Sequence, residues 1–498
     1  MTAIVNGRGL TRPRNLGSDT MNTNVGSFGD LDATALAELL RNGEVSALEL
    51  VDDAIRRCEQ VNGTLNAVVT EMFDRAREEA RQPLGDGPFA GVPFLMKDFV
   101  AEVEGVAFTE GSAFLEGYVP SEDSEIYKRY RRAGLITIGK TNLPEFAIGV
   151  TTESRLFGAA RNPWDPERTT GGSSGGSGAA VAARVVPMAH GNDVGGSIRI
   201  PASCCGLVGL KLTRGRTTFA PHYGDLFSGL LSEHVLTRTV RDTAILLDAV
   251  AGPAVGDPYV APPPARAFAK EVGANPGRLR IGFSTQTPLG DSLDPECEKA
   301  VQSTAALCDS LGHEVVEASP SFDGMELWQK FTTLLASGVA WALADWARRL
   351  DRELSSEHFE PFVWAFSERG RVLSAADYLL ALQDVQRQVR ALCEFFVPHD
   401  LWLTPTLGQP PVPLGTLVYR DDPFEFRRRM ARFSPYTYIS NASGQPAISV
   451  PLHWTEDGLP VGLHFLARHG EEAVLLRLAG QLESAKPWID RRPQVCAD

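Results

Sequence analysis

Residues 171–190 read GGSSGGSGAAVAARVVPMAH, and this stretch determines how the chain around it is organised. Its first eight residues include five glycines, which permit backbone angles and close approaches that other residues cannot adopt. An apolar run typical of a helix, AAVAARVV, and a short strand-like run, PMAHG, follow at once. Apolar segments this close disfavour a flexible linker. The glycines therefore predict a shaped turn that opens a buried helix, followed by a strand.

The segments before this turn alternate between strand and helix patterns. Ser46 and Glu49 make a capping box ahead of an amphipathic run, which predicts a helix start. We expect strands within 65–72, 92–97 and 135–139, and helices at 73–82 and 124–133. The alternation predicts an α/β fold, namely a single large α/β/α domain. Its central sheet would be mixed, largely parallel and covered by helices on both faces.

The segments after the turn continue this domain. Residues 279–318 predict a further β-α-β unit, and strand patterns return at 443–452 and 459–467. If these late strands join the early sheet, residues 28–498 form one domain behind a flexible tail at 1–27. Residues from about 320 to 435 predict long helices, little strand and a variable substrate region. Four of the tryptophans in this region indicate either core packing or a substrate cleft: Trp328, Trp341, Trp346 and Trp364.

Composition excludes several classes of protein. The net charge of −14, from 62 acidic and 48 basic residues, argues against nucleic-acid binding. The nearest basic run, Arg427-Arg428-Arg429, is interpreted as the solvated face of a helix. No apolar stretch approaches the roughly 20 residues that span a bilayer, and no secretory signal is recognised. The seven cysteines include no CxxC pair, so we expect a cytoplasmic protein without disulfides or bound metal.

The glycine-rich stretch also matches a known catalytic pattern. Residues 172–176 satisfy GxSxG, the nucleophile elbow of α/β-hydrolases, which arises easily by chance among glycines. That fold would need an acid and a histidine further along the chain, and His399, His453, His464 and His469 are available. A phosphate-binding P-loop is disfavoured because no lysine follows the glycines.

A second turn lies at 192–199, NDVGGSIR. Ser197 follows two glycines, so its hydroxyl can be exposed while nearby backbone N–H groups point at one spot, as an oxyanion hole requires. Asp193 and Arg199 bracket the turn and could pair beneath it. The alternative is a purely structural turn that contains a buried ion pair.

Lys97 ends an apolar strand and is followed by Asp98. One interpretation is a lysine paired with an acid at the end of a strand. The other is that burial lowers the pKa of the Lys97 ammonium, which would leave a neutral amine able to accept a proton. A serine nucleophile needs such an activating neighbour.

Three segments together resemble the amidase signature family: VPFLMKD (92–98), GGSSGGSGAAVAA (171–183) and NDVGGSIRIPASCCGLVGLK (192–211). The spacing fits, with 76 residues from Lys97 to Ser173 and 24 from Ser173 to Ser197. The signature core covers about 90–215, where Phe99 and Leu212 depart from the usual pattern. HGND, RIPAS and a closing QLESAKPWIDRRP make bacterial 6-aminohexanoate cyclic-dimer hydrolases the most similar group.

The resemblance implies a Ser–cis-Ser–Lys triad. Ser197 would be the nucleophile, Ser173 the proton relay after a cis peptide, and Lys97 the base. The implied oxyanion donors are the backbone N–H groups of Val194, Gly195, Gly196 and Ser197. The residues implied to support the triad from behind are Ser174, Asp193 and Arg199.

The implied activity is hydrolysis of a small-molecule amide through an acyl-enzyme, with neither metal nor cofactor. Cyclic or linear oligoamides such as 6-aminohexanoate dimer are the expected substrates. A glutamine-dependent transamidase A-type subunit, or an ester or carbamate hydrolase, is an alternative within the family. A binding protein that kept the fold is a further alternative, against which the intact triad argues. No nucleic-acid or membrane partner is expected, and a homodimer is left open.

Overall fold

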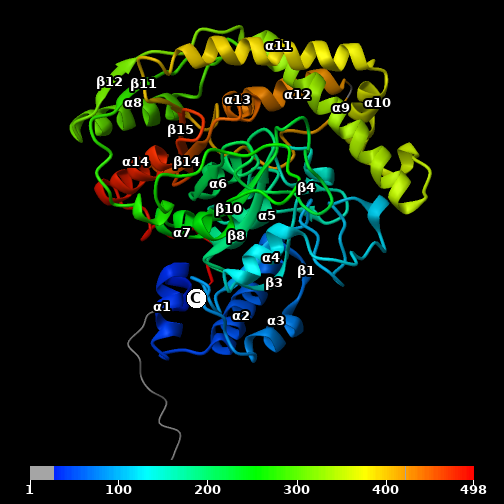
Figure 1. Ribbon diagram of the computed structural model, residues 1–498, viewed down its shortest axis with the longest axis vertical. Coiled ribbons are helices and arrows are strands. Elements are labelled where there is room, and N and C mark those ends of the chain that lie inside the picture. Colours follow the sequence, from blue (N-terminus) through cyan, green and yellow to red (C-terminus); the bar gives the residue numbers. More distant parts are fainter. Residues whose placement is uncertain (1–26, 421, 498) are drawn as a thin grey trace, which may run out of the picture.

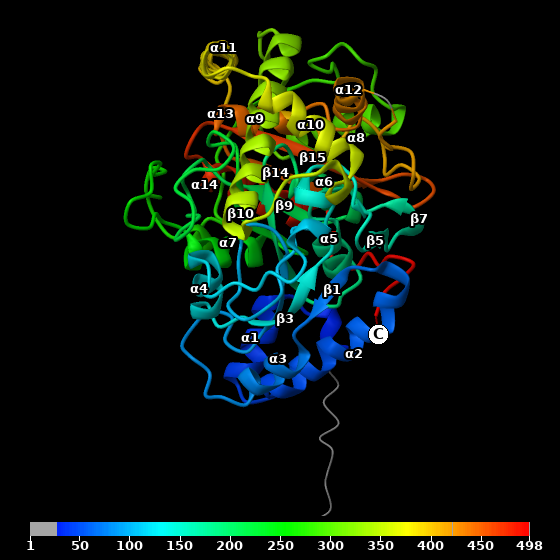
Figure 2. The ribbon, with the colours of Figure 1, turned by 90° about the vertical axis from the view of Figure 1, so that its right-hand side faces the viewer.

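The computed structural model describes residues 27–420 and 422–497 (Figures 1 and 2). Its core is one 11-stranded sheet. In spatial order the strands are β1 (Val68–Glu71), β3 (Ile136–Thr141), β2 (Pro93–Lys97), β8 (Met188–Asp193), β10 (Ser232–Thr237), β9 (Val208–Lys211), β14 (Ala447–Trp454), β15 (Pro460–Ala467), β13 (Leu401–Pro405), β11 (Arg280–Phe283) and β12 (Glu314–Glu317). Two short ladders lie outside it: β4 (Glu153–Ser154) with β5 (Gly158–Ala159), and β6 (Arg161–Asn162) with β7 (Asp165–Thr169).

The helices pack on both faces of this sheet, as predicted. They are α1 (Ala33–Arg41), α2 (Ala47–Leu65), α3 (Phe73–Ala80), α4 (Glu125–Arg132), α5 (Gly175–Ala182), α6 (Arg199–Cys205), α7 (Val240–Val250), α8 (Pro295–Ser310), α9 (Gly324–Leu350), α10 (Pro361–Arg371), α11 (Ala375–Glu394), α12 (Pro423–Phe433), α13 (Thr437–Ser443) and α14 (Glu472–Ala485). Alternate residues of a strand point to opposite faces. On β2, Phe94 and Met96 accordingly pack with α1, α4 and α7, whereas Leu95 packs with α2, α5 and α6.

The early elements follow the sequence patterns. Helix α2 begins at the predicted capping box, in which the Ser46 hydroxyl accepts from the Glu49 N–H and the Glu49 carboxylate accepts from the Ser46 N–H. The late strand β14 pairs with the early strand β9, so one sheet joins the two halves of the chain. The predicted tail at 1–27 lies outside the described residues except for Ser27. The domain limits therefore stay a prediction.

The expectation of a largely parallel sheet is wrong at the centre. Parallel pairing is confined to β3–β2–β8 on one flank and β13–β11–β12 on the other. From β8 through β10, β9, β14 and β15 to β13, every neighbouring pair is antiparallel. Antiparallel strands need no crossover helix, and β14 turns into β15 through only residues 455–459. The mixed character of the sheet is confirmed.

Strand β13 was not expected inside the helix-rich region at 320–435. Its five residues are all buried between β15 and β11. A short run that is buried on both faces cannot be assigned to strand or helix from periodicity alone. The other main elements of that region are the helices α9–α12, as predicted, and loops connect them.

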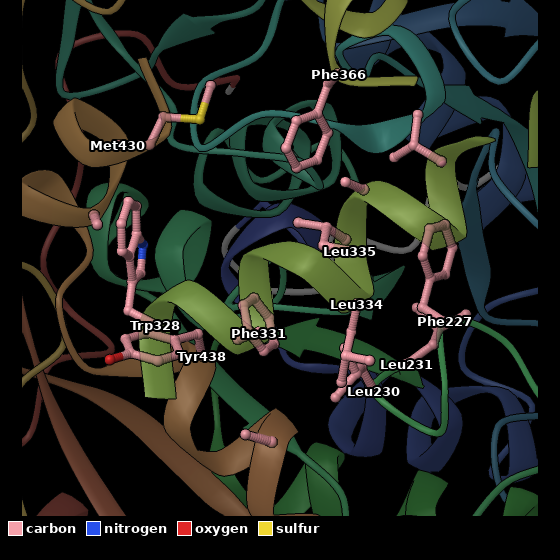
Figure 3. Close-up of a cluster of buried hydrophobic side chains, with 14 of the residues drawn as sticks. Phe227, Leu230, Leu231, Trp328, Phe331, Leu334, Leu335, Phe366, Met430 and Tyr438 are labelled. Atoms are coloured by element: carbon pink, nitrogen blue, oxygen red, sulfur yellow. The ribbon is translucent and has the colours of Figure 1, made fainter. Parts of the chain in front are cut away.

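Helices α9–α12 form a cap at the end of the molecule opposite α1 and α3 (Figures 1 and 2). Trp328 and Trp346 are buried in the apolar core of this cap, whereas Trp341 is 42% exposed. In Figure 3, Trp328, Phe331 and Leu335 project from α9 into this core. None of the helices in the described residues is long and apolar enough to cross a membrane.

Candidate active site

The predicted triad residues meet where two neighbouring strands end. β2 and β8 are parallel, so their carboxyl ends lie at the same edge of the sheet. Lys97 is the last residue of β2, and the turn that carries Ser197 connects β8 to α6. Ser173 comes just before α5, after a cis peptide bond from Gly172, as the family resemblance implied.

Lys97 is fully buried, and its Nζ lies 2.7 Å from the Ser173 hydroxyl and 2.6 Å from Oδ1 of Asn192. Burial lowers the pKa of Lys97 from 10.5 to about 7, although the carboxylates of Asp193, Glu233 and Glu110 favour the charged form. A substantial neutral fraction is thus present near neutrality. The alternative interpretation, a lysine paired with an acid, is wrong, because Lys97 forms no ion pair within the described part of the chain and the adjacent Asp98 pairs with Lys140 at 3.0 Å.

Asn192 was not singled out from the sequence, although it begins the second motif. Its Nδ2 donates to the Phe99 carbonyl at 3.2 Å, which fixes the amide with Oδ1 toward Lys97. An amide oxygen only accepts hydrogen bonds, so Lys97 must donate to Asn192. The lone pair of the neutral Lys97 amine is then available to the Ser173 hydroxyl. Asn192 therefore orients the base.

The turn after β8 presents Ser197 to a cavity. Ser197 is half-buried, and no hydrogen-bond partner for its hydroxyl occurs among residues 27–420 and 422–497. The backbone N–H groups of Val194, Gly195 and Ser197 likewise have no acceptor within this described part of the chain. These three groups are free to bind an oxyanion. Gly196 was also expected as a donor, but its N–H already donates to Oδ1 of Asp193 at 2.7 Å.

Asp193 and Arg199 do pair beneath this turn, as predicted. Arg199 donates to the two carboxylate oxygens at 2.8 and 3.0 Å, and both side chains are fully buried. Asp193 also accepts from the Ile198 N–H at 3.1 Å. Burial alone would raise the pKa of Asp193, but the charge and hydrogen bonds of Arg199, with further hydrogen bonds, lower it to about 2. The carboxylate therefore stays ionised and holds the turn in shape.

Residues near the C-terminal end of the chain also contact the Asp193–Arg199 pair. Asn441 accepts from Arg199 at 2.7 Å and donates to the Asp193 carboxylate at 2.9 Å. Arg199 also donates to the Thr437 carbonyl at 2.8 Å and lies 3.0 Å from Nε2 of His464. These residues sit on α13 and β15, more than 200 residues from the turn, and no local pattern pointed to them.

Ser174 lies directly behind the turn. Its N–H donates to the Ser197 carbonyl at 3.3 Å, and its hydroxyl donates weakly to the Asn192 carbonyl at 3.4 Å. In the GxSxG interpretation Ser174 would be the nucleophile and would need a histidine. None contacts its side chain in the part of the chain that the structure describes. The geometry therefore disfavours the nucleophile elbow.

Ser173, Asn192 and Ser197 line a cavity whose empty volume, together with the open solvent at its mouth, is about 700 Å³. The opposite walls are mostly apolar and come from α9, α12 and α13 (Figure 3). Trp328 belongs to both the core of the cap and this wall. Arg427 lines the cavity as well, so its interpretation as part of a solvated face is wrong. A hydrophobic pocket with a few polar groups suits a small organic ligand.

Comparisons with known proteins agree with this geometry. A sequence model described as Amidase matches residues 49–476. The 6-aminohexanoate-cyclic-dimer hydrolase of Paenarthrobacter ureafaciens is 39% identical over 477 residues, which cover 93% of this chain and 96% of that protein. The crystal structure of a 6-aminohexanoate cyclic dimer hydrolase complexed with substrate superposes with a TM-score of 0.89 at 38% identity, covering 94% of this chain and 99% of that one. A bacterial aryl acylamidase gives a TM-score of 0.83 at 26% identity, covering 92% of this chain and 96% of that one.

Proposed function

The chain belongs to the amidase family, and we propose that it hydrolyses carboxylic amides through an acyl-enzyme on Ser197. The contact between Lys97 and Ser173 carries this proposal, because a buried amine with a pKa of about 7 can accept a proton near neutrality. Ser197 and Ser173 line the same largely apolar cavity, and the backbone N–H groups of Val194, Gly195 and Ser197 have no acceptor in the described chain.

The proposed first half-reaction acylates Ser197. Neutral Lys97 accepts the proton of Ser173 while Ser173 accepts that of Ser197, and the Ser197 oxygen attacks the amide carbonyl carbon. The N–H groups of Val194, Gly195 and Ser197 stabilise the oxyanion, an effect typically worth about 10²–10³ in rate per donor. Collapse of the intermediate breaks the C–N bond, and the relay returns the proton to the leaving amine.

The second half-reaction frees the enzyme. Water gives one proton to the relay and its oxygen attacks the acyl carbon. Collapse then releases the carboxylic acid and restores the Ser197 hydroxyl.

The substrate proposal rests on the cavity and on the relatives. Apolar walls suit aliphatic chains or rings, and related proteins act on 6-aminohexanoate cyclic dimer. We therefore propose cyclic or linear oligoamides as substrates. Ester or carbamate hydrolysis is the second candidate, because the acyl-enzyme chemistry is shared. A cytoplasmic location, a homodimer and the transamidase alternative stay predictions for experiment.

The test is amine release from a panel of amides: a simple aliphatic amide, an anilide, glutamine, and the cyclic and linear 6-aminohexanoate dimers. Ser197→Ala and Lys97→Ala should each abolish release while the protein stays folded. Matched controls are Ser310→Ala and Lys299→Ala, exposed residues of helix α8. Full activity of either site variant would refute the mechanism, and a wild type active on glutamine alone would favour the transamidase.

A further inference from the structure

Helix α12 carries four arginines, and Arg427 differs from the other three. Arg428 and Arg432 both pair with Asp291, and Arg429 donates to the Val418 carbonyl. Arg427 forms no ion pair within the part of the chain that the structure describes.

The contacts that Arg427 does make are weak. Its Nη1 lies 3.7 Å from the Met430 sulfur, and its guanidinium lies 6.0 Å from the centre of the Phe366 ring. Its Nε is buried without any hydrogen-bond partner among the described residues. Burial, with no carboxylate to oppose it, lowers the pKa of Arg427 to about 10. A cation desolvated in this way is costly unless it has a partner.

Arg427 is also the only charged side chain among the described residues that line the cavity with Ser197. A second donor without a partner occurs in the same wall. The indole N–H of Trp328 is buried and unpaired, and Trp328 is only 1% exposed. The Trp328 ring packs edge-on against Phe424, one turn before Arg427 on α12, with ring centres 4.8 Å apart. Figure 3 shows Trp328 on α9 and Met430 on the helix that carries Arg427.

We propose that Arg427, assisted by the indole N–H of Trp328, binds a carboxylate of the substrate. The preferred substrates would then be amides whose apolar chain ends in an acid group. A guanidinium presents N–H donors in a fork that matches the two oxygens of a carboxylate. A neutral amide carbonyl offers one oxygen and no charge, so it would leave the cation uncompensated. This inference rests on the proposed function, because it uses the same cavity.

The binding test needs no turnover. Calorimetry on Ser197→Ala compares 6-acetamidohexanoate with its methyl ester, which has the same chain without the charge. We expect the acid to bind about 10- to 100-fold more tightly, since hydrogen bonds to charged groups are worth about 1.5–3 kcal/mol. Adding Arg427→Met should reduce this ratio to near one, and adding Trp328→Phe should reduce it about threefold. Adding Arg432→Met, which removes an arginine of the same helix outside the cavity wall, should leave the ratio unchanged.

Measurements of stability and of kcat/KM show whether the carboxylate inference or the proposed amidase function fails. Arg427→Met should unfold at equal or higher urea concentration than wild type, because it removes an unpaired charge from an apolar site. In wild type, kcat/KM for the acid should exceed that for the ester. Equal binding of acid and ester, or a ratio that survives Arg427→Met, overturns the inference even if amides are hydrolysed. A preference for the acid that is lost in Arg427→Met supports the inference that Arg427 binds a carboxylate, even if no amide is hydrolysed. In that case only the proposed function fails.

Discussion

Replacing Lys97 by methionine should abolish activity and yet stabilise the protein near neutral pH. The folded state lowers the pKa of Lys97 from 10.5 to about 7, because the amine is desolvated. One pKa unit corresponds to about 1.4 kcal/mol, so burying this lysine costs about 4 kcal/mol at pH 7. The same relation gives a cost of about 2 kcal/mol at pH 9.

Whether stability rises or falls with pH depends on which state of the chain, folded or unfolded, binds the Lys97 proton more tightly. Between pH 7 and 10.5 the unfolded chain keeps the Lys97 proton and the folded protein loses it, so wild-type stability rises with pH in this window. Lys97→Met has no ionisable group at this position, so it lacks this pH-dependent contribution to the free energy of unfolding. The substitution also leaves the Ser173 hydroxyl and Oδ1 of Asn192 without the lysine as a partner, at a cost of about 2 kcal/mol. The variant should therefore be about 2 kcal/mol more stable at pH 7 and close to wild type at pH 9.

Urea denaturation of both proteins from pH 6 to pH 9 measures this difference. Lys140→Met is the matched control, because Lys140 is equally buried but pairs with Asp98 at 3.0 Å. Removing that partner should destabilise the protein by about 3–5 kcal/mol. Stability curves of wild type and Lys97→Met that run parallel from pH 7 to pH 9 would refute the argument that Lys97 is buried as a neutral amine.

Three further predictions concern the turn and the base. Arg199→Met should lower the free energy of unfolding by about 3–5 kcal/mol, because the Asp193 carboxylate is left buried without its cation; a loss below about 1 kcal/mol in urea denaturation would contradict this. Gly196→Ala should reduce kcat at least about tenfold, because its Cβ would lie 2.3 Å from Oγ1 of Thr437 and its φ of +136° favours glycine. A Cβ on Gly195 would lie 3.5 Å from its nearest neighbour, so Gly195→Ala should change the free energy of unfolding by less than about 1 kcal/mol. Amide turnover should fall as the pH drops through about 7, the pKa of the base, and a rate independent of pH from 5 to 8 would argue against a lysine base.

The sequence predicted those parts of the site that depend on local pattern. Glycine is unfavourable in the interior of a helix or a strand, so the glycine pairs next to Ser173 and Ser197 marked two shaped turns. Lys97 was recognisable as a charge at the end of an apolar strand. Because each of these features needs only a few neighbouring residues, each could be found without a fold.

The remaining features depend on segments that meet only in the folded chain. The N–H of Gly196 is occupied because Asp193 lies below the turn, which sequence spacing does not reveal. Arg427 has the same sequence environment as Arg428, yet one lines the cavity and the other pairs with Asp291, because successive residues face different sides of α12. The sequence of strand β13 has no hydrophobic periodicity that distinguishes a strand from a buried helix.

The central claim is that Ser197 carries the acyl group, and mapping a trapped acyl-enzyme tests it most directly. Wild type mixed with an anilide substrate is quenched in acid within milliseconds, digested with trypsin and measured by mass spectrometry. Cleavage after Arg184 and Arg199 releases residues 185–199, in which Ser197 is the only serine. Ser173 and Ser174 fall in the separate peptide 169–184. The account predicts the acyl mass on 185–199 and its loss in Ser197→Ala; an adduct on 169–184 would contradict it.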